Sequence, residues 1–230
     1  MSYTFHETTV LRLTVWLNAW QSGHITAFDA ANACESITGA LDVLINEAKH
    51  PWIDLLATYG PSSTPFRVAL PTPGNPDGIP RDVLTQFEIE TGFVVMEDRL
   101  VLGALPNGSW QAVSAQVTTA HHDFQHARIA LLQALGEAQQ ALAHLDLVGS
   151  RVTADNVLKD LTFGHVPPST PSRTIEALEQ ALRIATLARI ARDDSAALAS
   201  RSQDHERSRV LLDLERQAQT LLQAAASSRH

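Results

Sequence analysis

The sequence VTTAHHDFQHARIALLQALGEAQQALAHLDLV, residues 117–148, contains the clearest periodic pattern in the chain. Its apolar positions repeat every seven residues in two adjacent rows. The first row is Val117, Phe124, Leu131, Ala138 and Leu145, and the second is Ala120, Ala127, Ala134, Ala141 and Val148. Because alanine leaves the backbone accessible, another helix can approach the second row closely. We therefore expect one long helix over residues 117–148, packed against an antiparallel helix of the same chain or of a symmetry mate.

Two later segments could supply that neighbouring helix. Thr170 and Pro171 form an N-cap followed by a first-turn proline, and the apolar spacing behind them predicts a helix to about Arg192. The apolar repeat over residues 210–225 predicts a last helix. We expect residues 116–230 to form a bundle of three long helices.

The first part of the chain, residues 1–60, is also predicted to be helical. Apolar residues at three- and four-residue steps predict a first helix over residues 5–22. Thr26, followed three residues later by Asp29, gives a capping-box pattern, which predicts a second helix to about Ile37.

The segment that follows, residues 41–59, has helical spacing interrupted by Pro51. Proline removes a backbone donor and clashes with the preceding turn of a helix. Two short helices are therefore predicted here.

A change in composition begins at the turn-forming cluster GPSSTP, so residues 61–115 are predicted to form a small β-containing insert. The predicted strands are residues 66–70, 93–96, 100–102 and 110–113. Helical spacing over residues 81–91 predicts a β-α-β-β-β order, with a right-handed crossover if the first two strands pair in parallel. The fold class is thus α+β, mainly α: a helical bundle with a small mixed β-sheet insert, expected to form one compact structural unit.

Composition limits the class of partner. The 230 residues carry a formal net charge of −8, which disfavours binding to nucleic acid. The most arginine-rich stretch, residues 201–209, interleaves Asp204 and Glu206 with its arginines, which is typical of a solvated helix face of mixed sign.

The single cysteine and the N-terminal sequence indicate the compartment. Cys34 cannot form an intrachain disulfide, and its small apolar neighbours predict a buried core residue. The sequence MSYTFHETTV lacks the basic and apolar regions of a signal peptide, and no run of 18 apolar residues occurs. We expect a cytoplasmic protein that neither crosses nor binds a membrane.

Two histidines could in principle ligate a metal. On the predicted helix, His122 and His126 are one turn apart, which is the spacing of helical zinc sites. They lie on the polar face opposite the alanine row, and no third ligand has a recognisable signature. We therefore expect no metal and treat His122 and His126 as weak candidates.

The loop PTPGNPDGIP, residues 71–80, follows a predicted strand and precedes a predicted helix, where ligands collect in mixed sheets. Its four prolines remove amide donors, so a phosphate cradle is disfavoured and a rigid connector is favoured. If the loop does bind a ligand or a partner, the polar groups available are Arg67, Asn75, Asp77 and Arg81.

Other aromatic positions admit a functional and a structural interpretation. The segment FGHVPP, residues 163–168, is either a binding loop or a connection between helices. The four tryptophans could stack on a ligand, but their spacing favours core positions; they are Trp16, Trp20, Trp52 and Trp110. No nucleophile elbow, dinucleotide fingerprint or phosphate-binding loop is present, so no catalytic residue and no cofactor are predicted.

Three segments carry a resemblance to a known family. They are WLNAWQSGHITAFDAA at residues 16–31, RVALPTPGNPDGI at residues 67–79 and VPPSTPSR at residues 166–173. With these segments the chain resembles an uncharacterised family of conserved actinobacterial proteins with an LPxPGDPxGL pattern. This chain has Asn75 in place of the usual Asp and Ile79 in place of Leu. The resemblance implies a cytoplasmic actinobacterial protein and supplies no activity.

The leading hypothesis from the sequence is a non-enzymatic protein-interaction or regulatory protein. It rests on the alanine row, which favours self-association or association with another protein by helix packing. The alternative is a small-molecule binding protein or an enzyme, with a pocket between the β-insert and the helices.

Overall fold

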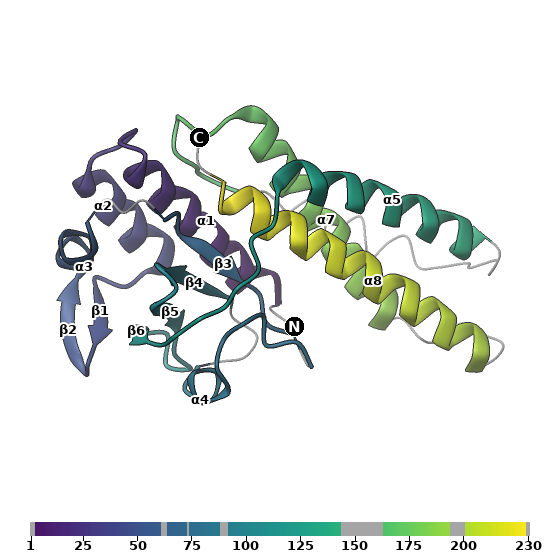
Figure 1. Ribbon diagram of the computed structural model, residues 1–230, viewed down its shortest axis with the longest axis horizontal. Coiled ribbons are helices and arrows are strands. Elements are labelled where there is room, and N and C mark those ends of the chain that lie inside the picture. Colours follow the sequence, from purple (N-terminus) through teal and green to yellow (C-terminus); the bar gives the residue numbers. More distant parts are fainter. Residues whose placement is uncertain are drawn as a thin grey trace. The chain divides into compact units, whose positions relative to one another are not determined.

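The computed structural model describes residues 3–60, 64–72, 74–87, 92–143, 163–193 and 201–228. It has the mainly helical α+β architecture that the sequence predicts. The chain divides into two compact units (Figure 1). Unit 1 comprises residues 1–121, 165–172 and 226–230, and unit 2 comprises residues 122–164 and 173–225.

Unit 1 begins with helices α1 (Tyr3–Gln21) and α2 (Ala27–Thr38). The hydroxyl of Thr26 accepts a hydrogen bond from the Asp29 N–H at 3.1 Å, and the Asp29 carboxylate accepts one from the Thr26 N–H at 3.2 Å. Gly39 ends α2 in the left-handed conformation, with φ of 68°. The predicted capping box is therefore confirmed.

A mixed six-stranded sheet forms the other part of unit 1, with the strand order β2-β1-β6-β5-β4-β3. The strands are β1 (Asp42–Ile45), β2 (Ala48–Pro51), β3 (Arg67–Ala69), β4 (Phe93–Met96), β5 (Leu100–Ala104) and β6 (Trp110–Ser114). β1 pairs with β6 in parallel, and the other neighbours are antiparallel.

The prediction of a helix directly after residue 41 is wrong, because β1 and β2 form a hairpin there. Asn46 and Glu47 connect the strands with φ of 49° and 66°, the conformation that tight hairpin turns require. The apolar residues of β1 imitate helical spacing over too short a run to distinguish the two structures. Of the two short helices predicted over residues 41–59, the later one is confirmed as α3 (Trp52–Tyr59), which begins directly after Pro51.

The predicted crossover between the strands at residues 66–70 and 93–96 is also wrong, since β3 and β4 are antiparallel. The helix predicted over residues 81–91 is the four-residue α4 (Arg81–Leu84), with turns through Phe87; residues 88–91 lie outside the described part. One helical turn is too short to carry the chain back along the length of β3. β4 therefore starts beside the end of β3, with Phe93 paired to Ala69.

Both faces of the sheet are covered at β4 and β5, because every residue of these two strands is buried. Helix α1 contacts β3 and β4, and it also packs against α2. A second hydrophobic cluster joins α4 and its flanking turns to the sheet and includes Val83, Phe87, Phe93 and Val117. The Asn18 side chain of α1 also holds the start of β3, since it hydrogen-bonds to both the N–H and the carbonyl of Phe66.

The helix predicted over residues 117–148 begins only after Asp123. Val117 is buried in the sheet cluster, and its N–H donates to the Asp98 carbonyl at 3.0 Å. The Asp123 carboxylate accepts from the His126 N–H at 2.9 Å, so it caps the helix that follows. Residues 117–123 are therefore not helical, and the segment starts with Val117 buried against the sheet.

The described part of unit 2 has three long helices: α5 (Phe124–Ala143), α7 (Ser172–Asp193) and α8 (Arg201–Ala226). In Figure 1, α8 runs in the opposite direction to α5 and α7. In the alanine row of α5, Ala127 and Ala134 are buried, and so is Ala138 of the first apolar row. Ala120 lies in the non-helical segment before α5 and is exposed, and residues 145–148 lie outside the described part.

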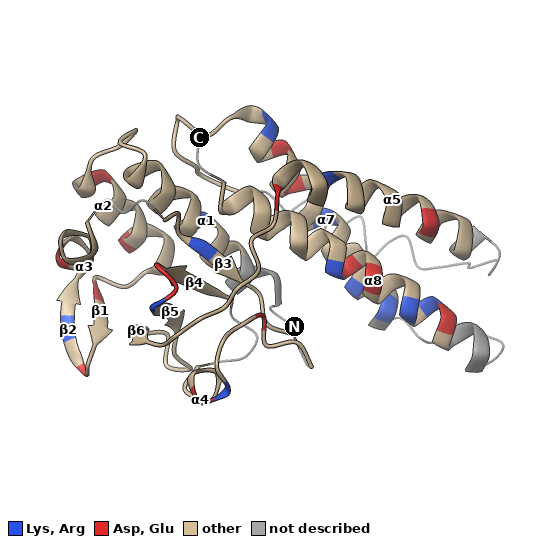
Figure 2. Cartoon of the chain, viewed as in Figure 1, with Lys and Arg blue, Asp and Glu red and all other residues tan. Residues whose placement is uncertain are grey.

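Charged side chains join α7 and α8. Glu215 is buried, and its carboxylate accepts hydrogen bonds from Arg189 and Arg192, each at 2.5 Å. Arg207 donates to the Ala191 carbonyl. Acidic and basic residues are interspersed along the described part of α8 (Figure 2), but Arg207 is buried and does not lie on the predicted solvated face.

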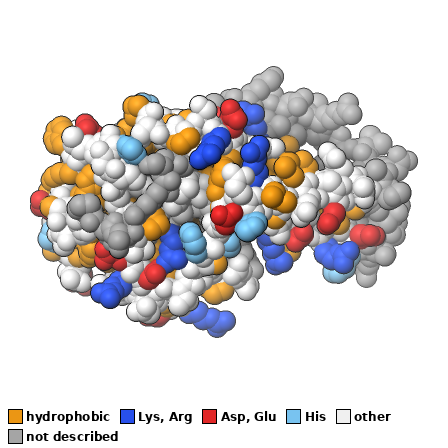
Figure 3. All heavy atoms as spheres, turned by 45° about the horizontal axis from the view of Figure 1, so that its top comes forward, with side chains coloured by type: hydrophobic (Ala, Val, Ile, Leu, Met, Phe, Trp, Pro, Cys, Tyr) orange, Lys and Arg blue, Asp and Glu red, His pale blue; other side chains and the backbone are white. Residues whose placement is uncertain are grey.

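Two further observations bear on partners. On the face drawn in Figure 3, acidic, basic and apolar side chains are interspersed over the described atoms. Among the described helices, none has both the length and the apolar character needed to span a membrane.

Candidate functional site

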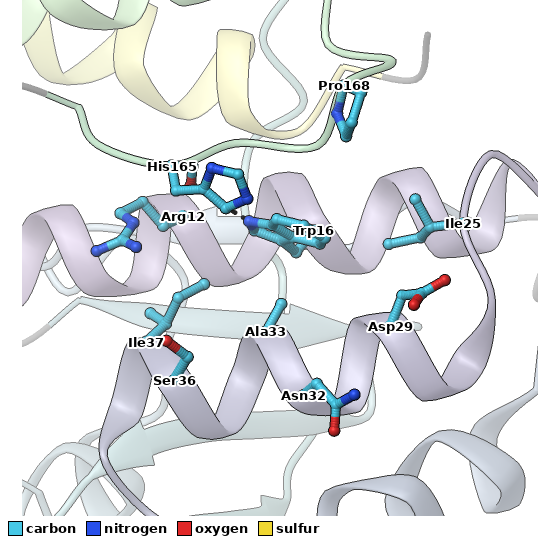
Figure 4. Close-up of a pocket in the computed structure, with 10 residues that line it drawn as sticks. All are labelled: Arg12, Trp16, Ile25, Asp29, Asn32, Ala33, Ser36, Ile37, His165 and Pro168. Carbon is cyan, nitrogen blue, oxygen red and sulfur yellow. Dashed lines mark hydrogen bonds between the residues drawn. The ribbon is translucent and has the colours of Figure 1, made fainter.

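A groove in unit 1 runs between helices α1 and α2 and has a volume of about 460 Å³. We call it the α1–α2 groove. Its lining residues come from both helices, from the turn between them and from the segment at residues 165–168 (Figure 4). They are Arg12, Trp16, Ile25, Asp29, Asn32, Ala33, Ser36, Ile37, His165 and Pro168.

The aromatic part of the groove is built by Trp16 and His165. The indole N–H of Trp16 donates to the His165 carbonyl at 3.3 Å, and the two ring centroids lie 5.5 Å apart. Trp16 is 7% exposed, so the indole is mostly packed against protein. The imidazole of His165 is exposed and lies beside the indole on the outer side of α1 in Figure 4.

Arg12 lies one helical turn before Trp16 and marks one end of the groove, above Ile37 in Figure 4. Its Nε atom is buried and, within the part of the chain that the structure describes, has no hydrogen-bond acceptor. Burial lowers the pKa of the Arg12 guanidinium from its usual value, although an arginine remains protonated at neutral pH.

The α2 wall supplies small and polar side chains. Ala33 is partly buried, and its methyl group leaves space above the helix between Asn32 and Ser36. The side chains of Asn32 and Ser36 are exposed, and each can donate or accept a hydrogen bond. Asp29, at the other end of the groove, is already engaged in the capping box with Thr26.

Arg67, which was predicted to contact a ligand, holds protein groups together. Its Nη1 donates to the Thr119 carbonyl at 3.0 Å, and its Nη2 forms an ion pair with the Asp98 carboxylate. Burial lowers the pKa of the Arg67 guanidinium. The side chain therefore links β3 to the turn between β4 and β5 and to the segment after β6.

The loop at residues 71–80 is fastened by its own polar groups. The Asp77 carboxylate accepts from the Leu70 N–H at 2.7 Å, and the Asn75 side-chain oxygen accepts from the Asp77 N–H at 3.2 Å. Thr72 and Asn75 exchange backbone hydrogen bonds of 2.9 and 2.8 Å. This geometry makes the loop a rigid connector.

Arg81 is exposed at the first position of α4. None of the four predicted site residues, Arg67, Asn75, Asp77 and Arg81, lines the α1–α2 groove. A ligand role for those four residues stays a prediction.

The structure separates the two histidines that were weak metal candidates. His122 precedes α5, so it does not share a helical face with His126. The exposed His126 lies 3.5 Å from the Asp123 carboxylate. Within the described residues, no group of three or more His, Cys, Asp or Glu side chains is placed to hold a metal ion.

Sequence reasoning missed the α1–α2 groove, although it noted two of its parts. Trp16 was one of four tryptophans that could stack on a ligand, and residues 163–168 were considered as a binding loop. The spacing of Arg12 and Trp16 places both on one helix face. Only the fold brings His165 next to Trp16, since the two are 149 positions apart.

Unit 2 has a groove of its own between α5 and α8, with a volume of about 450 Å³. Its floor includes Ala134, Ala138 and Val210, and acidic and basic side chains alternate along its edges. The groove exists because alanine side chains leave space between the helices.

Comparison with known proteins identifies the family. The family model described as "Rv1486c-like protein, N-terminal domain" matches residues 10–130, and the one described as "Rv1486c-like protein, C-terminal domain" matches residues 125–222. No curated protein and no solved structure matches the chain. The resemblance drawn from the sequence is confirmed, and the chain belongs to the Rv1486c-like protein family.

Proposed function

We propose that the protein binds a small organic molecule in the α1–α2 groove. The observation that carries the proposal is the combination of a volume of about 460 Å³ with aromatic, aliphatic and polar lining residues. Ligand sites in proteins have volumes of roughly 300–1,000 Å³, and they combine apolar walls with a few polar groups in this way.

The aromatic rings support binding of a flat ligand. Trp16 and His165 both line the groove, where their rings lie 5.5 Å apart and are inclined at 38°, and the imidazole of His165 is exposed. The hydrogen bond from the Trp16 N–H to His165 fixes their arrangement without a ligand. A preorganised aromatic surface costs little entropy when it binds.

The test is a binding screen with a variant that fills the groove. Small aromatic and aliphatic acids, amides and alcohols are screened by ligand-observed NMR and thermal shift. We expect at least one aromatic compound to bind the native protein. Ala33→Phe should abolish that binding, because the phenyl ring occupies the space above α2.

Ala57→Leu is the matched control, since Ala57 is exposed on α3 and does not line the groove. This variant should bind as the native protein does. If no compound binds, or if Ala33→Phe binds the same compounds with unchanged affinity, the proposed function is wrong.

A second candidate function is association with another protein through unit 2, the non-enzymatic interaction role that the sequence favours. It is supported by Ile129 and Leu132 on α5, which are 52% and 51% exposed. Leu212 of α8 is also exposed, at 37%. Ile129 and Leu132 lie three residues apart on α5, and exposed apolar side chains that lie together often mark protein interfaces.

Light scattering and affinity capture test this second function. We expect a dimer or a captured protein with the native chain, and loss of either with Leu132→Glu. A native chain that is monomeric at high concentration and captures no protein would exclude it. For both functions we propose a cytoplasmic location, which agrees with a single buried cysteine that forms no disulfide.

A further inference from the structure

The chemical class of the ligand follows from Arg12, and the argument rests on the proposed function. Two other partly buried arginines are held by acidic groups: Arg67 pairs with Asp98, and Arg189 pairs with Glu215. Arg12, in contrast, has a buried Nε atom with no acceptor in the described part of the chain. A partly desolvated cation without an acceptor costs free energy that an anion could offset.

Among the described residues that line the groove, no acidic side chain lies beside Arg12. Asp29 is the acidic residue of the lining, and Figure 4 shows it at the end of the groove opposite Arg12. Its carboxylate accepts hydrogen bonds from the hydroxyl and from the N–H of Thr26, at 2.7 and 3.2 Å. The Arg12 end of the groove is therefore positive.

Aromatic surface lies next to this positive end. Trp16 is one turn further along α1, so the guanidinium and the indole lie on the same side of the helix. His165 stands beside both residues in Figure 4, and its ring pairs with the indole. A ligand that reaches Arg12 with an anionic group thus places its neighbouring atoms against the aromatic rings.

We propose that the α1–α2 groove binds a planar aromatic carboxylate, with the carboxylate on the Arg12 guanidinium and the ring against Trp16 and His165. A guanidinium presents parallel N–H groups that match the two oxygens of a carboxylate. Asn32 and Ser36, on the opposite wall, can hydrogen-bond to polar substituents of the ring. Each part of the groove then has a role in recognising one ligand.

Three probes separate the contributions of charge and ring. 2-Naphthoate has both features, 2-naphthamide keeps the ring without the charge, and cyclohexanecarboxylate keeps the charge without the aromatic ring. Dissociation constants are measured by calorimetry with the native protein. We expect 2-naphthoate to bind about tenfold or more tightly than either of the other two probes.

Substitution of Arg12 gives an independent result. Arg12→Gln should weaken 2-naphthoate by about tenfold, to the level of 2-naphthamide, while leaving 2-naphthamide unchanged. Arg12→Lys keeps the charge without the paired donors and should give an intermediate affinity. Arg81→Gln is the control, because Arg81 is exposed outside the groove and its loss should change neither probe.

The outcomes distinguish this inference from the function on which it rests. If the native protein binds 2-naphthoate and 2-naphthamide equally, Arg12 does not recognise a carboxylate and the inference is overturned. This comparison uses the native protein alone, so it does not depend on whether a variant folds. If that binding is still lost in Ala33→Phe, the groove remains a ligand site. If none of the three probes binds and no compound of the wider screen binds, both the ligand class and the proposed function are overturned.

Discussion

The indole N–H of Trp16 donates a hydrogen bond to the backbone carbonyl of His165, 3.3 Å away. This contact attaches residues 165–172 to α1 within unit 1. It also sets the position of the His165 ring, whose centroid lies 5.5 Å from that of the indole. One side chain therefore both stabilises the fold and shapes the groove.

Trp16→Phe should loosen this attachment. Phenylalanine keeps an aromatic ring but cannot donate to the His165 carbonyl, so we expect a loss of about 1 kcal/mol in the free energy of unfolding. The Thr170 N–H, which donates to the Pro167 carbonyl at 2.9 Å, should exchange its hydrogen faster. Urea unfolding and hydrogen exchange measure the two effects. Trp20→Phe is the control; equal exchange at Thr170 in both variants would contradict the assignment.

Gly78 should be among the least replaceable glycines of the chain. A Cβ atom there would lie 2.6 Å from the backbone carbon of Thr118, and φ is 78°. Gly108 has a similar φ of 82° and open space around it. Gly108→Ala should therefore cost about 1 kcal/mol from backbone conformation alone, whereas Gly78→Ala should cost about 2 kcal/mol more from overpacking. Equal melting temperatures for the two variants would refute the close contact.

Among the acidic residues of unit 2, Glu215 should contribute most to stability. Its carboxylate is 6% exposed and is held by Arg189 and Arg192. Glu215→Ala removes the buried carboxylate that Arg189 and Arg192 share and should destabilise the protein by about 3 kcal/mol. Glu137→Ala, at an exposed position of α5, should change stability by about 0.5 kcal/mol at most. Denaturant unfolding of the two variants makes the comparison.

Cys34 should be unreactive in the folded protein. Burial, and secondarily the charge of Glu35, raises the pKa of its thiol above the ordinary value. The folded state therefore retains the thiol proton at a pH where the unfolded state loses it. The stabilising contribution is fully present below the ordinary thiol pKa and decreases as pH rises above it. A thiol reagent should modify Cys34 at pH 8 only in denaturant, and rapid modification of the native protein would contradict its burial.

Local sequence patterns predicted those features that depend on neighbouring residues. Thr26 and Asp29 identified the start of α2. The apolar repeat of α5 predicted positions that are buried there, among them Ala127, Leu131 and Ala134. Such patterns are informative because helix caps and helix faces are completed within a few residues of the chain.

Features that depend on distant residues were predicted incorrectly or not at all. β1 resembled a helix because its strand character depends on pairing with β2 and β6. The helix at residue 124 was predicted to begin at Val117, since the apolar repeat contains no information about the sheet that buries Val117. In both places, burial against another element outweighs the local preference.

The sequence by itself determined the fold class, the family and the ends of several helices, because these follow from periodicity, capping residues and short motifs. The tertiary structure alone decided the strand directions and the α1–α2 groove. Arg12 and Trp16 carry no functional signature in sequence, and they become a candidate site only because α2 and His165 pack beside them. These neighbours are brought together by the packing of segments that are far apart in the sequence, and a local sequence pattern carries no information about such packing.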